Sequence, residues 1–110
     1  MKGPQDGLTR IEIAALIAVL RLDGDAYGVS IHDDIEQVRG QALSMAATYA
    51  ALTRLARQRL IRSRQSAPVA VQGGRSRRLY AITSLGLTVL EHERAADARL
   101  WQALPTKRRA

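Results

Sequence analysis

Cysteine and phenylalanine do not occur in this sequence, and tyrosine and tryptophan together account for only 4% of its residues. The lack of cysteine excludes a disulfide framework and any metal site built from thiolates. Apolar residues nevertheless make up 46% of the 110 positions, so leucine, isoleucine, valine and alanine must fill the core. This length suits one compact domain, and a domain this small often gains stability by sharing a core with a second copy.

Long hydrophobic runs are also lacking. No apolar run approaches the roughly 20 residues that a helix needs to span a bilayer. Met1–Gly7 carries a lysine, a proline and two glycines before any apolar stretch, which is not the pattern of a secretory signal. We therefore expect a cytoplasmic protein.

Acidic residues are missing from the whole of Gln37–Leu90, although the chain has ten of them. The same span holds nine arginines, at positions 39, 54, 57, 59, 62, 64, 75, 77 and 78, and the net charge of the chain is +7. Guanidinium groups bind phosphate oxygens through paired hydrogen bonds, so a segregated, arginine-rich surface favours nucleic acid as the partner. The alternative is that the basic surface only keeps the protein in solution.

Capping residues and helical periodicity predict a first helix that begins after Thr9 and ends near Leu22. Thr9 and Glu12 have the three-residue spacing of a capping box. Apolar side chains follow on nearly every side of this helix. We therefore expect it to be buried on nearly every side, with a second subunit as a candidate to cover one of them.

A second and a third helix are predicted over residues 27–38 and 45–58. In the second, apolar side chains repeat at helical spacing, while His32 and its acidic neighbours face solvent, and Gly40 closes the element. Ser44 is the predicted N-cap of the third helix. The outward side of that helix consists of small residues and arginines, a composition that suits close approach to a DNA groove.

A hairpin and a long helix complete the chain. The strands are predicted at Leu60–Gln65 and Arg75–Ile82, with Leu79 opposite Ile61. Thr83 caps the last helix, which continues to about residue 104 and overhangs so small a domain. A second subunit is the obvious surface on which it could pack.

This order of elements predicts a mainly α (α+β) fold, a winged helix-turn-helix with three helices, a two-stranded wing and a long C-terminal helix. Residues 9–82 form the expected DNA-binding domain, residues 83–104 the dimerisation helix and residues 105–110 a basic tail. In this fold the third helix enters the major groove, and the wing supplies arginines to the flanking backbone or minor groove. The predicted DNA-binding residues are Ser44, Tyr49, Thr53, Arg54, Arg57, Arg64, Arg75, Arg77 and Arg78.

Individual roles within that set differ. Ser44 lies where free backbone N–H groups favour a phosphate. Arg54 and Arg57 either read guanine or hold phosphate, and the sequence leaves both possibilities open. Tyr27 and Tyr80 are assigned to the core rather than to the site. The predicted dimerisation residues lie along the last helix and are Leu85, Val89, Ala96, Leu100, Trp101 and Leu104.

Several short motifs in fixed order resemble one family of bacterial proteins. They are Tyr27-Gly28-x-x-Ile31, Ser44 with Tyr49, Leu52-x-Arg54-Leu55, Leu60-Ile61, Gly74-Arg75-x-Arg77-Arg78-x-Tyr80, and Thr83-x-x-Gly86-x-x-x-Leu90. Over roughly residues 10–104 the sequence resembles the PadR-type transcriptional regulators. The resemblance implies a homodimer joined by its C-terminal helix, usually a repressor, and often one relieved by a small aromatic or drug-like effector. It also places Ser44 and Tyr49 at the DNA backbone and the three arginines of the fifth motif on the wing.

The sequence departs from the family pattern at several positions. Ala46-Ala47-Thr48 replaces Gly-Thr-Leu, Ala50 replaces a proline, Ala56 replaces an acid, and Arg59 replaces a glycine. These changes make the DNA-facing side more basic, which indicates a different operator and more non-specific affinity. The usual tryptophan of the last helix is Asp97 here, which puts a ligand stacked between paired tryptophans in doubt. Trp101 is interpreted as an anchor of the dimer.

Other classes of function remain as alternatives. The chain could be a nucleoid-associated or RNA-binding winged helix without a specific site, or an interaction module that has lost DNA binding. An enzyme is the least expected class, because the sequence has no nucleophile paired with a base and no phosphate-binding glycine loop. No cofactor or metal is expected, since His32 and His92 are far apart and the acids around His32 are expected on an exposed helix edge.

Overall fold

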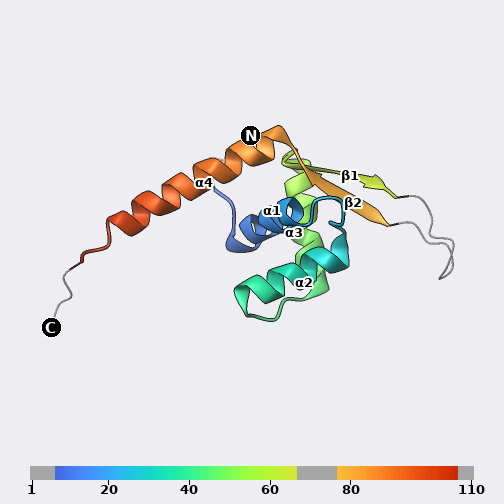
Figure 1. Cartoon of the computed structure of the whole chain (residues 1–110), viewed down its shortest axis with the longest axis horizontal. Coiled ribbons are helices and arrows are strands. Elements are labelled where there is room, and N and C mark those ends of the chain that lie inside the picture. Colours follow the sequence, from blue (N-terminus) through green and yellow to red (C-terminus); the bar gives the residue numbers. More distant parts are fainter. Residues whose placement is uncertain (1–6, 67–76, 107–110) are drawn as a thin grey trace.

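The computed structural model describes residues 7–66 and 77–106. In this part of the chain the elements are α1 (Arg10–Arg21), α2 (Gly28–Arg39), α3 (Met45–Arg57), β1 (Ile61–Gln65), β2 (Arg78–Ile82) and α4 (Ser84–Gln102). The first three helices form a cluster, the hairpin projects from one side of it, and α4 extends away on the other (Figure 1). The predicted mainly α winged helix-turn-helix is confirmed.

Helix α1 begins with the predicted capping box. The Glu12 N–H donates to Thr9 Oγ1 at 3.1 Å, and the Thr9 N–H donates to Glu12 Oε1 at 2.9 Å. The prediction that α1 is buried on nearly every side is wrong for the single chain, because Ile17 is 40% and Leu20 is 45% exposed. Helices α2, α3 and α4 and strand β2 all contact α1, but together they leave one apolar strip uncovered.

Helices α2 and α3 are joined by a short turn, with a capping residue where α2 ends and another where α3 begins. Gly40 ends α2 in the left-handed region, with φ of +68°, and its N–H donates to the carbonyl of Glu36. Ser44 caps α3 by accepting from the Ala47 N–H at 3.0 Å. Leucine and isoleucine dominate the core that the helices enclose, and its largest fully buried apolar side chains are Leu16, Ile31, Ile35, Leu52, Leu55, Leu60 and Val19.

The two strands pair antiparallel in a register that the sequence did not predict. Ile61 lies opposite Ile82, and Leu79 lies opposite Arg64, so the expected pairing of Leu79 with Ile61 is wrong. Pairing starts at the base of the hairpin, where the Thr83 N–H donates to the carbonyl of Leu60 at 3.0 Å. On its other edge β2 receives the segment before α2, because the Tyr80 N–H donates to the carbonyl of Ala26 at 2.8 Å.

Helix α4 is fixed to the hairpin at its first turn. Thr83 Oγ1 accepts from the Gly86 N–H at 3.0 Å and donates to the carbonyl of Arg59 at 2.7 Å. Gly86 lies directly against the carbonyl of Leu60. A Cβ atom at position 86 would overlap that carbonyl oxygen, so the contact requires a glycine. The helix ends at Gln102, two residues before the predicted end, and its second half extends away from the other helices (Figure 1). Within the described ranges no helix has the length and apolar character that crossing a membrane requires.

Candidate nucleic-acid interface

Helix α3 exposes a narrow face made of small side chains, one tyrosine and one arginine. Thr48, Ala51, Leu52 and Leu55 are buried on its inner side. The outer side exposes Ala46, Tyr49, Ala50, Thr53 and Arg57, at three- and four-residue steps. No acidic residue occurs in this helix, and Ser44 at its start is also exposed. The predicted residues Ser44, Tyr49, Thr53 and Arg57 are therefore brought to one accessible side.

Arg54 has an intramolecular partner that the sequence did not reveal. Its Nε donates to Glu12 Oε2 at 2.5 Å, and Glu12 is only 5% exposed. The ion pair ties α3 to the first turn of α1, and it leaves only the two terminal nitrogens of the guanidinium for DNA. Arg57, by contrast, makes no hydrogen bond or ion pair within the described residues.

The arginines of the hairpin are divided between its two faces. Cross-strand neighbours share a face, so Ser63 and Tyr80 lie on one side, and Arg64 and Leu79 lie on the other. The side with Tyr80 faces α3 across a hollow of about 400 Å³ that is lined by Thr53, Arg57, Ser63, Arg78, Tyr80 and two further α3 residues. Arg64 instead lines a separate hollow beside Asp23 and Gly24. Arg75 lies outside the described residues.

A second hollow, of about 610 Å³, adjoins the first and shares Arg78 and Tyr80 with it. Its lining consists of Tyr27, Gly28, Val29, Tyr49, Arg77, Arg78 and Tyr80. The guanidinium of Arg77 lies over the ring of Tyr27, 4.5 Å from its centroid. Arg78 Nη1 donates to Ser63 Oγ at 3.0 Å. Neither hollow is lined by a carboxylate.

Tyr27 and Tyr80 lie at the edge of the core rather than wholly inside it. Tyr80 packs against the core, as expected, but both tyrosines are only half-buried and line the second hollow. The sequence carried a signal for this arrangement, because Arg77-Arg78-x-Tyr80 places a tyrosine on the same strand face as Arg78. Burial raises the pKa of the Tyr80 hydroxyl, with Arg78 opposing the effect and Tyr49 adding to it.

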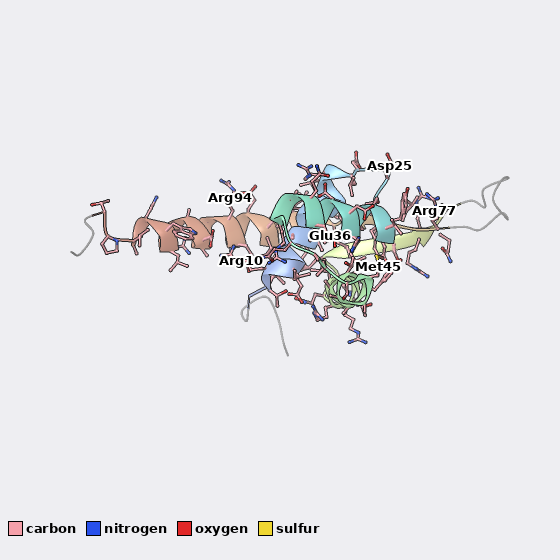
Figure 2. The ribbon with its side chains drawn as sticks, turned by 90° about the horizontal axis from the view of Figure 1, so that it is seen from below. Arg10, Asp25, Glu36, Met45, Arg77 and Arg94 are labelled. Atoms are coloured by element: carbon pink, nitrogen blue, oxygen red, sulfur yellow. The ribbon has the colours of Figure 1, made fainter. Side chains whose placement is uncertain are left out.

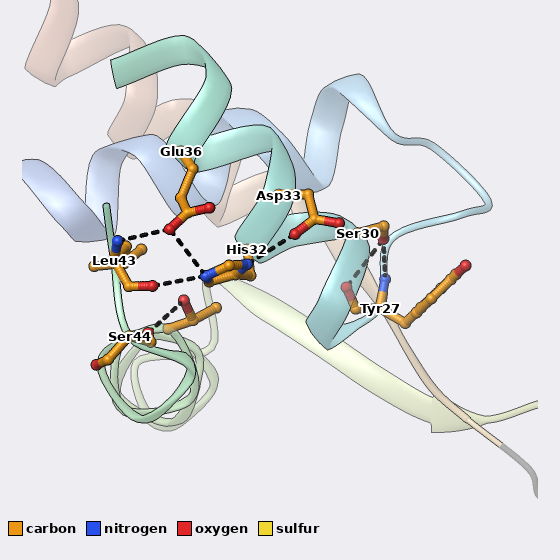
Figure 3. A network of polar contacts seen from close by, with 8 residues as sticks. Tyr27, Ser30, His32, Asp33, Glu36, Leu43 and Ser44 are labelled. Carbon is orange, nitrogen blue, oxygen red and sulfur yellow. Dashed lines mark hydrogen bonds and ion pairs between the residues drawn. The ribbon is translucent and has the colours of Figure 1, made fainter. Parts of the chain in front are cut away.

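His32 is held in a network at the turn before α3, so its predicted position on a solvent-exposed face is wrong (Figure 3). Its side chain is 15% exposed, Nδ1 lies 2.9 Å from Asp33 Oδ1, and Nε2 lies 2.6 Å from the carbonyl oxygen of Leu43. Glu36 accepts from the Leu43 N–H at 2.8 Å. The hydrogen bond to Asp33 and then that to Leu43 raise the pKa of His32 above its ordinary value near 6.5.

The same network explains why a histidine and two acids gather on α2. His32, Asp33 and Glu36 lie close enough together to hold a metal ion. However, both ring nitrogens of His32 and one oxygen of Glu36 are already engaged in hydrogen bonds. The cluster therefore anchors the turn that leads into α3, which is a structural role.

The model of the transcriptional regulator PadR-like family matches residues 16–92. This chain belongs to that family. Like its relatives, this PadR-like chain is a DNA-binding transcription regulator and not an enzyme. No curated protein sequence matches it.

Several solved structures share the fold, among them PadR family regulators. One is a PadR family transcription regulator from a hypervirulent Clostridium difficile strain, with 28% identity, a TM-score of 0.61, and coverage of 84% of this chain and 93% of that one. The circadian clock associated protein Pex from Anabaena has 26% identity, a TM-score of 0.54, and coverage of 86% and 78%. A PadR-like regulator from Bacillus cereus has 19% identity, a TM-score of 0.65, and coverage of 84% and 87%, a likeness that concerns the fold alone.

Helix α4, on the other side of the helical cluster from the hairpin, carries exposed apolar side chains among its charged ones and contains no tyrosine. Figure 2 shows Arg77 on the hairpin side of the helical cluster and Arg94 part-way along α4 on the other side. Leu85, Leu100, Trp101 and Leu104 are between 48% and 68% exposed, and Ala96 is also exposed. Val89 differs from these predicted dimerisation residues, because it is 6% exposed and packs in the core of its own chain. Little of its surface is left for a partner.

Proposed function

We propose that this PadR-like regulator is a homodimeric repressor that binds a specific duplex operator with α3 in the major groove. One observation carries the proposal. The exposed side of α3 and the two hollows beside it present arginines and tyrosines, and no carboxylate lines either hollow. Such a surface attracts the phosphate backbone, and a helix of this width fits the major groove.

The composition of α3 supports close approach to the bases. Ala46, Ala50 and Thr53 are short, so the helix backbone can lie deep in the groove. Methyl groups of alanine and threonine contact thymine methyls, whereas Arg57 is long enough to reach guanine or a phosphate. Because few of these side chains form hydrogen bonds with bases, the shape of the duplex contributes to the specificity we propose.

The proposed dimer rests on apolar surface that the single chain leaves uncovered. Ile17 and Leu20 are exposed on α1, and Leu100, Trp101 and Leu104 are exposed on the second half of α4. Trp101 is held in place by its Nε1, which donates to Asp97 Oδ2 at 3.2 Å. A second copy packed on these residues would remove them from water and would set two α3 helices one DNA turn apart.

The proposal includes a cytoplasmic location. It also includes relief of repression by a small aromatic effector. A hollow of about 440 Å³ between α1 and α4 is lined by apolar residues, including Ile13, Ile17 and Leu90, and by charged residues. Its size lies within the range of ligand sites. Because Ile17 belongs also to the proposed dimer surface, a ligand in this hollow would act on the spacing of the two subunits.

The experiment that tests the proposal is a titration of the purified protein against its own upstream DNA and a scrambled duplex, at two salt concentrations. We expect a preference for the upstream fragment that persists at the higher salt, since contacts to bases depend less on salt than contacts to phosphates. Equal binding of both duplexes that collapses at the higher salt would contradict specific repression. It would favour a nucleoid-associated protein, which the alanine-rich face of α3 also fits.

A further inference from the structure

The backbone between α2 and α3 is held by two side chains of α2. Within the described ranges, the backbone of residues 41–43 forms hydrogen bonds only at Leu43. Its N–H donates to Glu36 Oε2 at 2.8 Å, and its carbonyl oxygen lies 2.6 Å from His32 Nε2. The Leu43 side chain also packs against the core. Ser44, the N-cap of α3, follows directly, so these contacts determine where α3 begins (Figure 3).

The contacts of His32 call for a proton on each ring nitrogen. Nε2 faces the carbonyl oxygen of Leu43, Nδ1 faces Asp33 Oδ1 at 2.9 Å, and both oxygens are acceptors. Imidazolium donates from both nitrogens, whereas the neutral ring has one donor and one lone pair. In the neutral ring the two acceptors therefore compete for a single proton. The carboxylate is the stronger acceptor, so deprotonation weakens the hydrogen bond to Leu43.

The charged groups that face this ring in the described part of the chain come from α2. Asp33 is hydrogen-bonded to Nδ1, Glu36 Oε2 lies 3.4 Å from Nε2, and both carboxylates favour the imidazolium. The turn contributes the neutral carbonyl of Leu43, and the first turn of α3 contains no charged residue. The hydrogen bonds to Asp33 and Leu43 outweigh the effect of desolvation, so the pKa of His32 is raised.

We propose that His32 makes operator binding depend on protons: its imidazolium fixes the start of α3, and loss of the proton loosens that start and weakens binding of the duplex. The inference rests on the proposed function, in which α3 enters the major groove, and adds regulation by pH to it. A helix whose start is already fixed loses less entropy on binding than one that must be ordered on the DNA. By linkage, bound DNA must then raise the affinity of His32 for its proton.

The test is a series of titrations with the chain's own upstream duplex between pH 6 and pH 8.5, at constant ionic strength and with folding checked by circular dichroism. Affinity should be highest below the pKa of His32, which lies above 6.5, and should fall by about three- to tenfold as the pH rises, the range for one hydrogen bond. His32→Gln keeps a neutral donor for Leu43, and its affinity should change little with pH. His92→Gln, on an exposed part of α4, is the matched control and should keep the full dependence.

Asp33→Asn tests the competition between the two acceptors. The substitution removes the charged acceptor at a position that is 67% exposed, so the neutral ring should keep its Nε2 proton on the carbonyl of Leu43. The pH dependence of binding should therefore shrink. The pKa of His32 should also fall, because the hydrogen bond to Asp33 is the largest of the effects that raise it. Asp25→Asn, at an exposed acid before α2, is the control and should change neither quantity.

Proton NMR of the histidine rings measures the linkage separately from affinity. His32 and His92 are the two histidines of the chain, so the spectrum of His92→Gln assigns the signals of His32. For a tenfold effect on affinity, the pKa of His32 should be about one pH unit higher in the complex than in the free protein. Equal pKa values, with the preference for the upstream duplex intact, would overturn the switch and leave the proposed function standing. If no duplex binds at any pH even at low salt, the proposed function falls and the switch falls with it.

Discussion

At the scale of single residues, two glycines of the family motifs have a steric role. Gly86 lets the first turn of α4 approach the carbonyl of Leu60, and Gly28 lets the ring of Tyr49 approach the start of α2. Arg59 shows the opposite situation, because it stands where the family has a glycine and adopts a φ of +63°. A left-handed conformation costs an ordinary residue about 1–2 kcal/mol, so the added charge at this position comes with backbone strain.

Replacement of Gly86 by alanine should lower the free energy of unfolding by about 1–3 kcal/mol, the usual cost of an extra methyl group in a packed region. The new Cβ would overlap the backbone of Leu60, which has no rotamer by which to move away. Urea denaturation followed by circular dichroism measures the change. Ser84→Ala, at an exposed position in the same turn, should change stability by less than about 0.5 kcal/mol. Equal stability of Gly86→Ala and the wild type would contradict the close packing.

Arg54→Ala should lower the free energy of unfolding by about 1–3 kcal/mol, because it leaves the buried carboxylate of Glu12 without its partner. Arg57→Ala is the comparison, since Arg57 is exposed on the same helix and has no partner in the described ranges. It should reduce DNA affinity without changing stability. Thermal unfolding of both variants, together with DNA titrations, separates the two roles. Similar melting temperatures for the two variants would argue against the Arg54–Glu12 pair.

At the scale of elements, the turn between α2 and α3 determines how α3 is presented. His32 and Glu36 of α2 hold the carbonyl and the N–H of Leu43, the residue just before the N-cap of α3. Imidazolium can donate from both ring nitrogens, to Asp33 and to Leu43, whereas the neutral ring can donate from only one. Protonation of His32 therefore strengthens the link between the two helices.

The stability of the fold should accordingly depend on pH near neutrality. The pKa of His32 in the folded protein is raised above 6.5, so its stabilising effect is complete below pH 6.5 and is lost as the pH rises through the folded-state pKa. Urea unfolding midpoints between pH 6 and pH 8 measure this loss. In His32→Gln the dependence should be reduced, and in His92→Gln, on an exposed part of α4, it should persist. A pH profile unchanged by His32→Gln would contradict the role of this network.

At the scale of the whole molecule, the two ends have different surfaces. The end with the hairpin and α3 carries arginines and tyrosines, and the end with α4 carries exposed leucines and Trp101. This separation fits the proposed dimer, because partner binding and DNA binding then use different parts of the chain. A variant that weakens the proposed dimer should therefore reduce DNA binding only indirectly, through loss of the second α3 helix.

Trp101→Ala should weaken the proposed dimer by about tenfold or more in Kd, as expected for a large aromatic at the centre of an interface. Sedimentation at several protein concentrations measures the change. Gln102→Ala, the next residue on α4 and also exposed, is the control and should leave Kd nearly unchanged. DNA affinity of Trp101→Ala should recover at high protein concentration, where the dimer re-forms. A wild-type protein that stays monomeric under these conditions would overturn the dimer.

The sequence by itself determined much of the fold, because the residues that begin and end each helix act on backbone groups only a few positions away. The capping box of Thr9 and Glu12, the N-caps Ser44 and Thr83, and the left-handed Gly40 each depend on residues a few positions away. The segregation of charge is also a property of the sequence, and by itself it indicates nucleic acid as the partner. Helix ends and the class of partner could therefore be predicted.

Only the tertiary structure decided which distant residues meet. Three contacts depend on how packed elements approach one another: the pairing of Ile61 with Ile82, the ion pair of Arg54 with Glu12, and the hydrogen bond between His32 and the carbonyl of Leu43. The same holds for Tyr27 and Tyr80, which a hydrophobicity pattern assigns to the core alone. Periodicity shows which side of an element is apolar. The partner of a polar group at the edge of that side is set by long-range packing. A single sequence therefore does not predict which residue that partner is.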